Sequence, residues 1–146
     1  IMTKKIILAS HGRFASGMLS AAKMIIGELK GVDSFDLEDY ESPYEIYKNI
    51  EHAMKQEKDT VFLILTDLLG GSVNNQLLEL CTNKNVYVIA GANLGMLLEL
   101  YLTDDNKEIR TIVKDSVEAS KQNIRFFGYP INDYVDHKEL MEVNLW

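Results

Sequence analysis

Two apolar runs of this sequence each end in a short polar loop. Residues 6–9 lead to His11, and residues 61–65 lead to Asp67 and then to a glycine-bearing stretch at residues 70–72. An imidazole can act as a nucleophile, an acid, a base or a metal ligand, and glycines let another molecule approach backbone amides closely. A histidine, a carboxylate and free amides at neighbouring strand ends suit the holding of a phosphoryl group on the imidazole.

His11 is the candidate nucleophile, because it follows a predicted strand and precedes Gly12, which permits an exposed turn. Asp67 is the candidate partner, since a carboxylate bonded to one imidazole nitrogen fixes the tautomer and leaves the other nitrogen free to attack. A solvated histidine and an aspartate that merely shapes its loop are the plainer alternatives. The location of both residues at strand ends favours the functional roles.

Gly70, Gly71 and Ser72 open the helix that follows the second run. Unpaired amides at a helix start form an anion site, so these residues and Gly12 are predicted to contact phosphoryl oxygens. Ser72 has two candidate roles, as the helix cap or as a hydroxyl donor to the anion. Arg13 is the one cation expected near these loops, and it either assists anion binding or is simply solvated. The lack of a Gly-Lys-Ser/Thr sequence argues against a nucleotide P-loop.

Leu68 and Leu69, together with Asn93 and Leu94 at the start of a later helix, form a candidate docking patch for a protein partner. Ordinary helix packing is the alternative for these side chains. Neither a metal nor another cofactor is expected, because no second histidine lies at ligand spacing from His11 and no carboxylate cluster adjoins it.

The periodicity of apolar residues predicts the elements that must position these loops. Strands are expected at residues 4–9, 35–40, 60–65, 86–90 and 124–127, and helices at residues 14–29, 43–54, 72–81, 93–102 and 108–121. In the helix at residues 72–81, Leu77, Leu78 and Cys81 are expected to face inward.

Alternating strands and helices imply an α/β fold with an open, mainly parallel sheet, in the strand order 2-1-3-4, and helices on both faces. That order makes the first and third strands neighbours. His11 and Asp67 would then meet at the topological switch point, where ligands bind in open sheets.

The length of 146 residues indicates one domain, expected at residues 1–128, and a tail at residues 129–146 with a short helix near residues 137–141. The formal net charge of −7 argues against nucleic acid and anionic membranes as partners. Cys81 is the only cysteine, which excludes a disulfide framework and fits a reducing, cytoplasmic compartment. No apolar run approaches the ~20 residues of a membrane span, no signal-peptide pattern is present, and Ile1 is expected to be foreign to the natural chain.

Three motifs stand in order along the chain. They are Ile-Leu-Ala-Ser-His-Gly at residues 7–12, Leu-Thr-Asp-Leu-Leu-Gly-Gly-Ser-Val-Asn-Asn at residues 65–75, and Val-Ile-Ala-Gly-Ala-Asn-Leu-Gly-Met-Leu at residues 88–97. Together they resemble the mannose-type IIA component of the bacterial phosphoenolpyruvate:sugar phosphotransferase system, over roughly residues 3–127. Val73 and Gly95 stand where that family usually has proline, which is expected to loosen both helix starts.

The resemblance implies that His11 accepts a phosphoryl group from the phosphohistidine of the carrier protein HPr and passes it to a IIB component. IIB then phosphorylates a sugar during transport through the membrane components IIC and IID. The resemblance also implies that Asp67 orients His11 and that Ser72 and nearby amides contact the phosphoryl oxygens. It further implies a homodimer in which a short antiparallel C-terminal strand, residues 124–127 here, is exchanged between subunits.

Two other interpretations remain at this stage. The phosphotransfer subunit of dihydroxyacetone kinase has a similar fold and the same histidine, although residues 70–72 and the Asn93-Leu94 helix start favour the sugar system. A small-ligand or flavin-binding module would use the same crevice without a covalent step.

Overall fold

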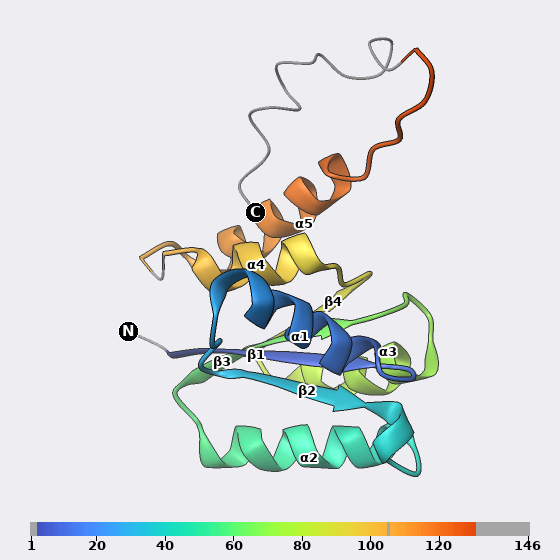
Figure 1. Ribbon diagram of the computed structural model, residues 1–146. Helices are drawn as coiled ribbons and strands as arrows, with labels where there is room; N and C mark the ends of the chain where they lie inside the picture. The colour runs from blue at the N-terminus through green and yellow to red at the C-terminus, as the bar shows by residue number, and fades with distance from the viewer. Residues whose placement is uncertain (1–2, 105, 131–146) are drawn as a thin grey trace.

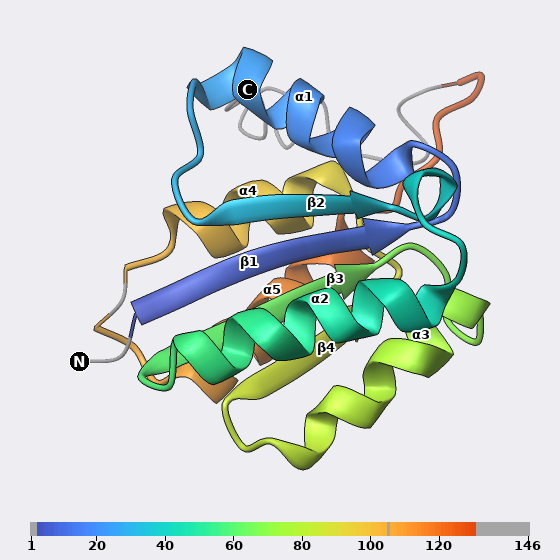
Figure 2. The ribbon, with the colours of Figure 1, turned by 90° about the horizontal axis from the view of Figure 1, so that it is seen from below.

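Four parallel strands form the central sheet of the protein, for which a computed structural model describes residues 3–104 and 106–130. The strands are β1 (Thr3–Ser10), β2 (Val32–Asp36), β3 (Thr60–Thr66) and β4 (Val86–Ala90). Their spatial order is β2-β1-β3-β4, which confirms the predicted order (Figure 2). The C-terminal ends of β1 and β3 therefore lie side by side, and Ala9 pairs with Thr66.

Helices cover both faces of this sheet. They are α1 (Phe14–Ile26), α2 (Pro43–Gln56), α3 (Ser72–Leu77), α4 (Leu94–Leu102) and α5 (Ile109–Gln122), with 3-10 segments η1 (Leu37–Asp39) and η2 (Leu78–Thr82). Figure 1 shows α1, α4 and α5 above the sheet and α2 below it, and Figure 2 shows α2 and α3 in front of the strands. The layers follow from the predicted right-handed crossovers.

Two apolar clusters hold these layers together, because neighbouring side chains of each strand point to opposite faces. Ile6 and Leu8 of β1 belong to the cluster under α1, α4 and α5. Ile7 and Ala9 belong to the cluster under α2 and α3. β3 is buried along its whole length, as a central parallel strand should be.

The predicted bounds of the first helix and of the second strand were wrong. The first helix ends at Ile26 rather than at residue 29, because Gly27 takes a positive φ of 82°. The second strand is Val32–Asp36 rather than residues 35–40, because the chain turns at Gly31 and enters η1 after Asp36.

The predicted helix at residues 72–81 changes character half-way along. α3 stops at Leu77 and continues as the tighter η2, so the inward face shifts. Leu77 and Leu80 are buried, whereas Leu78 and Cys81, which were expected inside, are exposed.

The strand expected at residues 124–127 does not form in this single chain. Residues 124–128 are irregular and leave the body of the protein beyond α5 (Figure 1). The helix expected near residues 137–141 lies outside the described residues. Within residues 3–104 and 106–130, no helix has the length and hydropathy to cross a membrane.

Candidate active site

His11 and Asp67 meet at the C-terminal edge of the sheet. His11 follows the end of β1, and Asp67 follows the end of the adjacent β3. One oxygen of Asp67, Oδ2, accepts hydrogen bonds from the His11 backbone amide and from the ring nitrogen Nδ1, both at 2.8 Å. The structure thus brings together the two residues that the sequence places at neighbouring strand ends.

The charge on Asp67 sets the tautomer of the ring. Burial raises the pKa of the Asp67 carboxyl, but the hydrogen bonds from the His11 amide and ring and from the Leu68 amide outweigh it. The net effect holds this pKa below its ordinary value of 3.8. The carboxylate is therefore ionised at neutral pH and can only accept a hydrogen bond. In the neutral form of the ring, Nδ1 accordingly carries the proton and Nε2 is the unprotonated nitrogen.

Ser72 lies on the other side of the ring. Its Oγ is 3.2 Å from Nε2, and the side chain of the helix cap, Gly71, can supply no cap bond. Of the two candidate roles for Ser72, the structure shows the hydroxyl directed toward the imidazole. The His11 side chain is 47% exposed, so another molecule can reach it.

Gly71 is packed close to the ring. A Cβ atom at this position would lie 3.3 Å from His11 Cε1 and 3.2 Å from the carbonyl oxygen of Leu68. The Gly71 amide donates to that same carbonyl at 3.0 Å, so it closes a turn and is not free to bind an anion. Gly71 therefore contributes close approach rather than the hydrogen bond predicted for it.

The other predicted amide donors remain available. Gly12 and Gly70 have positive φ angles of 50° and 80°, which glycine adopts without strain. Within the described part of the chain, the amides of Gly12, Gly70 and Ser72 make no hydrogen bond.

Arg13 points away from the imidazole. Its guanidinium makes ion pairs with Glu38 at 2.9 Å, Asp39 at 3.3 Å and the buried Asp36 at 3.6 Å. Asp36 also accepts a hydrogen bond from the Ser16 amide in the first turn of α1, at 2.9 Å. Neither of the two candidate roles, anion binding or simple solvation, describes Arg13 in the structure. Its ion pairs instead connect the start of α1 to the end of β2 and to η1.

The four candidate docking residues separate into two pairs. Leu68 and Leu69 are 62% and 78% exposed beside the site. Asn93 instead caps α4 by accepting from the Met96 amide at 2.9 Å, and Leu94 packs against the core. Ordinary helix packing thus accounts for the second pair.

The two missing prolines have different consequences. Val73 is fully buried in the cluster under α2 and α3, so its side chain packs the start of α3 from inside. The start of α4 before Gly95 is held by the Asn93 cap. The loosening predicted for α4 is therefore offset by a side-chain cap.

Sequence reasoning missed two features next to the site. Phe14 is 48% exposed at the start of α1, directly after the His11 loop. Thr66 and Asn74 form a buried hydrogen bond under the Asp67 loop. Their positions one residue before Asp67 and two after Ser72 were the available signal.

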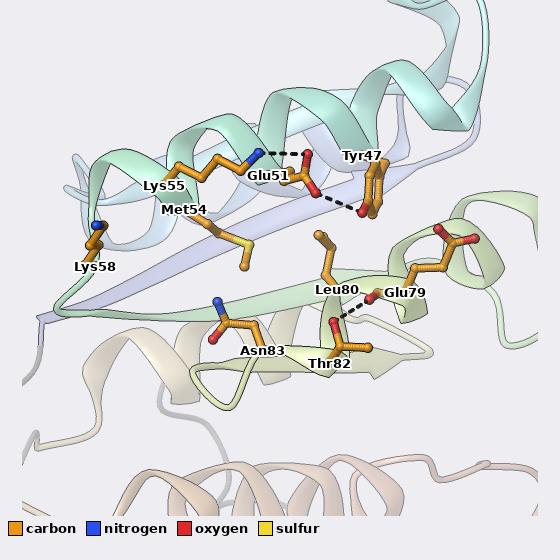
Figure 3. A pocket seen from close by; sticks show the side chains of 9 residues that line it. All are labelled: Tyr47, Glu51, Met54, Lys55, Lys58, Glu79, Leu80, Thr82 and Asn83. Carbon is orange, nitrogen blue, oxygen red and sulfur yellow. Dashed lines mark hydrogen bonds and ion pairs between the residues drawn. The ribbon is translucent and has the colours of Figure 1, made fainter.

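A separate hollow of about 310 Å³ lies between α2 and η2 (Figure 3). Its lining has an apolar floor of Met54 and Leu80, and charges of both signs that include Lys55 and Glu51. None of the site residues lines it. Within residues 3–104 and 106–130, no group of three or more His, Cys, Asp or Glu side chains is placed to hold a metal.

A model of the family described as "PTS system fructose IIA component", where PTS is the phosphotransferase system, matches residues 5–117. The chain belongs to this family. The match spans all three motifs and both loops of the site, so the IIA assignment and the geometry concern the same residues.

Relatives of the IIA family agree with this assignment. The mannose-specific EIIAB component of Escherichia coli K12 is 32% identical over 129 residues, which cover 85% of this chain and 39% of that protein. The sorbose-specific EIIA component of Lacticaseibacillus casei is 29% identical over 81% of this chain and 86% of its own length. The chain thus spans less than half of the first relative and most of the second.

A solved structure has the same fold. The mannose/sorbose-specific IIA subunit from Enterococcus faecalis superposes with a TM-score of 0.72 at 26% identity, over 88% of this chain and 98% of that chain. The α/β fold of this IIA family member is therefore shared by a protein named for sugar phosphotransfer.

Proposed function

We propose that this IIA protein is a phosphocarrier that accepts a phosphoryl group on His11 Nε2 from phospho-HPr and passes it to a IIB component. The observation that carries the proposal is the difference between the two ring nitrogens. Nδ1 is bound by the ionised Asp67 at 2.8 Å, whereas Nε2 keeps its lone pair beside the Ser72 hydroxyl. A nucleophile held by a carboxylate on its far side is the arrangement that activates histidine.

The transfer moves one phosphoryl group between two imidazoles. The Nε2 lone pair attacks the phosphorus in line with the N–P bond of the donor phosphohistidine. That bond breaks, its electron pair returns to the donor ring, and a new N–P bond forms at Nε2. The Nδ1 proton stays on His11, where Asp67 stabilises the added positive charge.

The phosphoryl oxygens would be held mainly by neutral donors. The Ser72 hydroxyl and the amides of Gly12, Gly70 and Ser72 supply them, and Gly71 gives the group room to approach. Arg13 is already paired with carboxylates, so it contributes no strong ground-state attraction. Weak ground-state binding favours onward transfer, because only interactions that are stronger in the transition state accelerate it.

Leu68 and Leu69 are the proposed docking residues for HPr and IIB in turn. Both are exposed beside the imidazole, where a partner must bring its own histidine within bonding distance. The IIC and IID membrane components act only indirectly, through IIB. Since HPr and IIB work in the cytoplasm, we assign this protein to the same compartment.

A homodimer is also proposed, with residues 124–127 exchanged between subunits. Ile124, Phe126 and Phe127 are 81%, 69% and 48% exposed in the single chain, which is unfavourable for large apolar side chains in water. Pairing with the edge of a second sheet would bury them.

The relatives named for mannose and sorbose favour the sugar system over a dihydroxyacetone kinase subunit. The same relatives favour the sugar system over a ligand-binding module without covalent chemistry. Capture of kinase subunits in place of IIB would overturn the first choice.

The test is phosphorylation by labelled phosphoenolpyruvate with enzyme I and HPr. The wild-type protein should gain an acid-labile, alkali-stable label and lose it when IIB is added. His11→Ala should gain none, and His52→Ala, which removes an exposed histidine of α2, should behave as wild type. Equal labelling of His11→Ala, or no labelling of the wild type, would refute the proposal.

A further inference from the structure

The two residues that hold the imidazole stand at the two ends of one loop. Asp67 begins the loop after β3 and binds Nδ1, and Ser72 begins α3 and lies 3.2 Å from Nε2. Asp67 and Ser72 can contact the ring at the same time only when the distance between these two loop ends is held fixed. The contact that sets this separation therefore controls the geometry of the whole site.

Thr66 and Asn74 lie just outside those ends, one residue before Asp67 and two residues after Ser72, and a hydrogen bond connects them. The Thr66 hydroxyl donates to the Asn74 side-chain oxygen Oδ1 at 2.7 Å, a short distance for such a bond. Thr66 is 0% and Asn74 is 1% exposed. The pair thus closes the base of the loop from β3 to the first turn of α3.

The pair lies in apolar surroundings. Alternation along β3 places Thr66 on the same face as Phe62 and Ile64, under α2 and α3. Val73, next to Asn74, is packed in the same cluster. A hydrogen bond in so dry a place is strong and directional, because water cannot compete for its partners.

This arrangement is not the most stabilising one available. The Asn74 amide nitrogen Nδ2 is buried without a partner, which carries a free-energy penalty. Valine at position 66 together with leucine at position 74 would avoid that penalty, and the leucine would still pack against Val73. The asparagine is explained better by what its oxygen holds in place than by stability.

Other bonds stiffen the loop but do not join its ends. The Asn75 side chain donates to the Gly70 carbonyl at 3.1 Å, and the Gly71 amide donates to the Leu68 carbonyl at 3.0 Å. On the β3 side, the Thr66 carbonyl accepts from the Ala92 amide at 2.9 Å. This bond fixes the end of β3 against the chain after β4, and the Thr66–Asn74 bond fixes the start of α3 relative to the end of β3.

We infer that Thr66 and Asn74 are a positioning pair whose buried hydrogen bond keeps Asp67 and Ser72 at the separation that clamps both nitrogens of the His11 ring. The inference rests on the proposed phosphoryl acceptance at His11 for its kinetic consequence, but its geometric consequence is independent of it. Without the bond, the ring should lose its single tautomer.

The experiment compares the wild type with the double variant Thr66→Val/Asn74→Leu. Replacing both partners by apolar groups leaves no unpaired polar atom, so the melting temperature should stay within about 4 °C of wild type or rise. Nitrogen-15 signals of the His11 ring should move from one Nδ1–H tautomer toward an average of two. The maximal rate of phosphorylation by phospho-HPr should fall roughly 10- to 100-fold, with the half-saturating phospho-HPr concentration within about twofold of wild type.

Two single variants serve as controls. Thr60→Val makes the same chemical change at the opposite end of β3 and should alter neither the ring signals nor the rate. Thr66→Ser keeps the hydroxyl and should retain both, whereas Thr66→Val should not. Should the double variant fail to fold, equal ring signals and rates in Thr66→Ser and Thr66→Val would overturn the inference.

A folded double variant with wild-type ring signals and a wild-type rate would also overturn it, since the pair would then be merely structural. Failure of the proposed function has a different signature. In that case the wild type itself would take up no phosphoryl group, while the ring signals would still report whether the pair positions His11.

Discussion

The substitution Gly71→Ala tests the packing of the imidazole with a single methyl group. The added Cβ would lie 3.3 Å from His11 Cε1 and 3.2 Å from the Leu68 carbonyl oxygen, both closer than ordinary van der Waals contact. The ring must then withdraw by a few tenths of an ångström. The Nε2–Ser72 Oγ distance is already 3.2 Å, so a withdrawal of that size away from Ser72 would weaken this contact.

The size of the effect can be worked out from this displacement. A misplacement of 1 Å can reduce a rate by about 10²-fold, so 0.3–0.5 Å corresponds to roughly 4- to 10-fold. Stability should change little. Gly71 has φ −70° and ψ 162°, which alanine adopts freely, so the free energy of unfolding should stay within about 1 kcal/mol of wild type.

The assay is single-turnover phosphorylation by phospho-HPr, with thermal unfolding measured in parallel. Gly17→Ala is the matched control, because Gly17 lies exposed within α1, and a Cβ there would meet nothing within 4 Å. It should raise stability by about 0.5–1 kcal/mol and leave the rate unchanged. A Gly71→Ala protein with the wild-type rate and wild-type ring nitrogen signals would show that the ring does not lie against Gly71.

Three further outcomes are expected. Ser72→Ala should slow phosphorylation about 10²-fold without a loss of stability, because the Ser72 side chain makes no cap bond. Asp67→Asn should slow phosphorylation roughly 10- to 100-fold. The pKa of Asp67 in the folded protein lies below 3.8. The free energy of unfolding of the wild type should therefore exceed that of Asp67→Asn by a constant amount above about pH 5, and this difference should vanish as the pH falls through the folded pKa. Lys4→Met should lower the free energy of unfolding by about 1–3 kcal/mol in urea titrations, because the ammonium donates to the Leu100 and Thr103 carbonyls at 2.8 and 3.4 Å.

The order of the sheet was predictable because it depends on patterns with few physical solutions. The continuous, β-branched apolar run at residues 61–65 is typical of a strand buried on both faces, and strand–helix alternation allows few strand orders. Boundaries were less predictable, because single residues decide them. Gly31 starts β2 three residues earlier than its apolar alternation suggests.

The pairing of His11 with Asp67 followed from the same few rules, since parallel strands bring their C-terminal ends to one edge. The orientation of Arg13 did not follow. Its partners Asp36, Glu38 and Asp39 lie more than twenty residues away, in a turn whose shape depends on tertiary packing. The Thr66–Asn74 bond escaped for a related reason, because a threonine and an asparagine in a motif do not reveal which way their side chains point.

One oxygen atom of Asp67 anchors both the main chain and the ring of His11. The backbone bond fixes the carboxylate relative to the main chain of His11, and the ring cannot turn over without breaking its Nδ1 contact with Asp67 and taking Nε2 away from Ser72. A group carried on Nε2 could not swing toward a second surface of the protein. Whatever delivers that group and whatever removes it would have to come to the same face, one after the other.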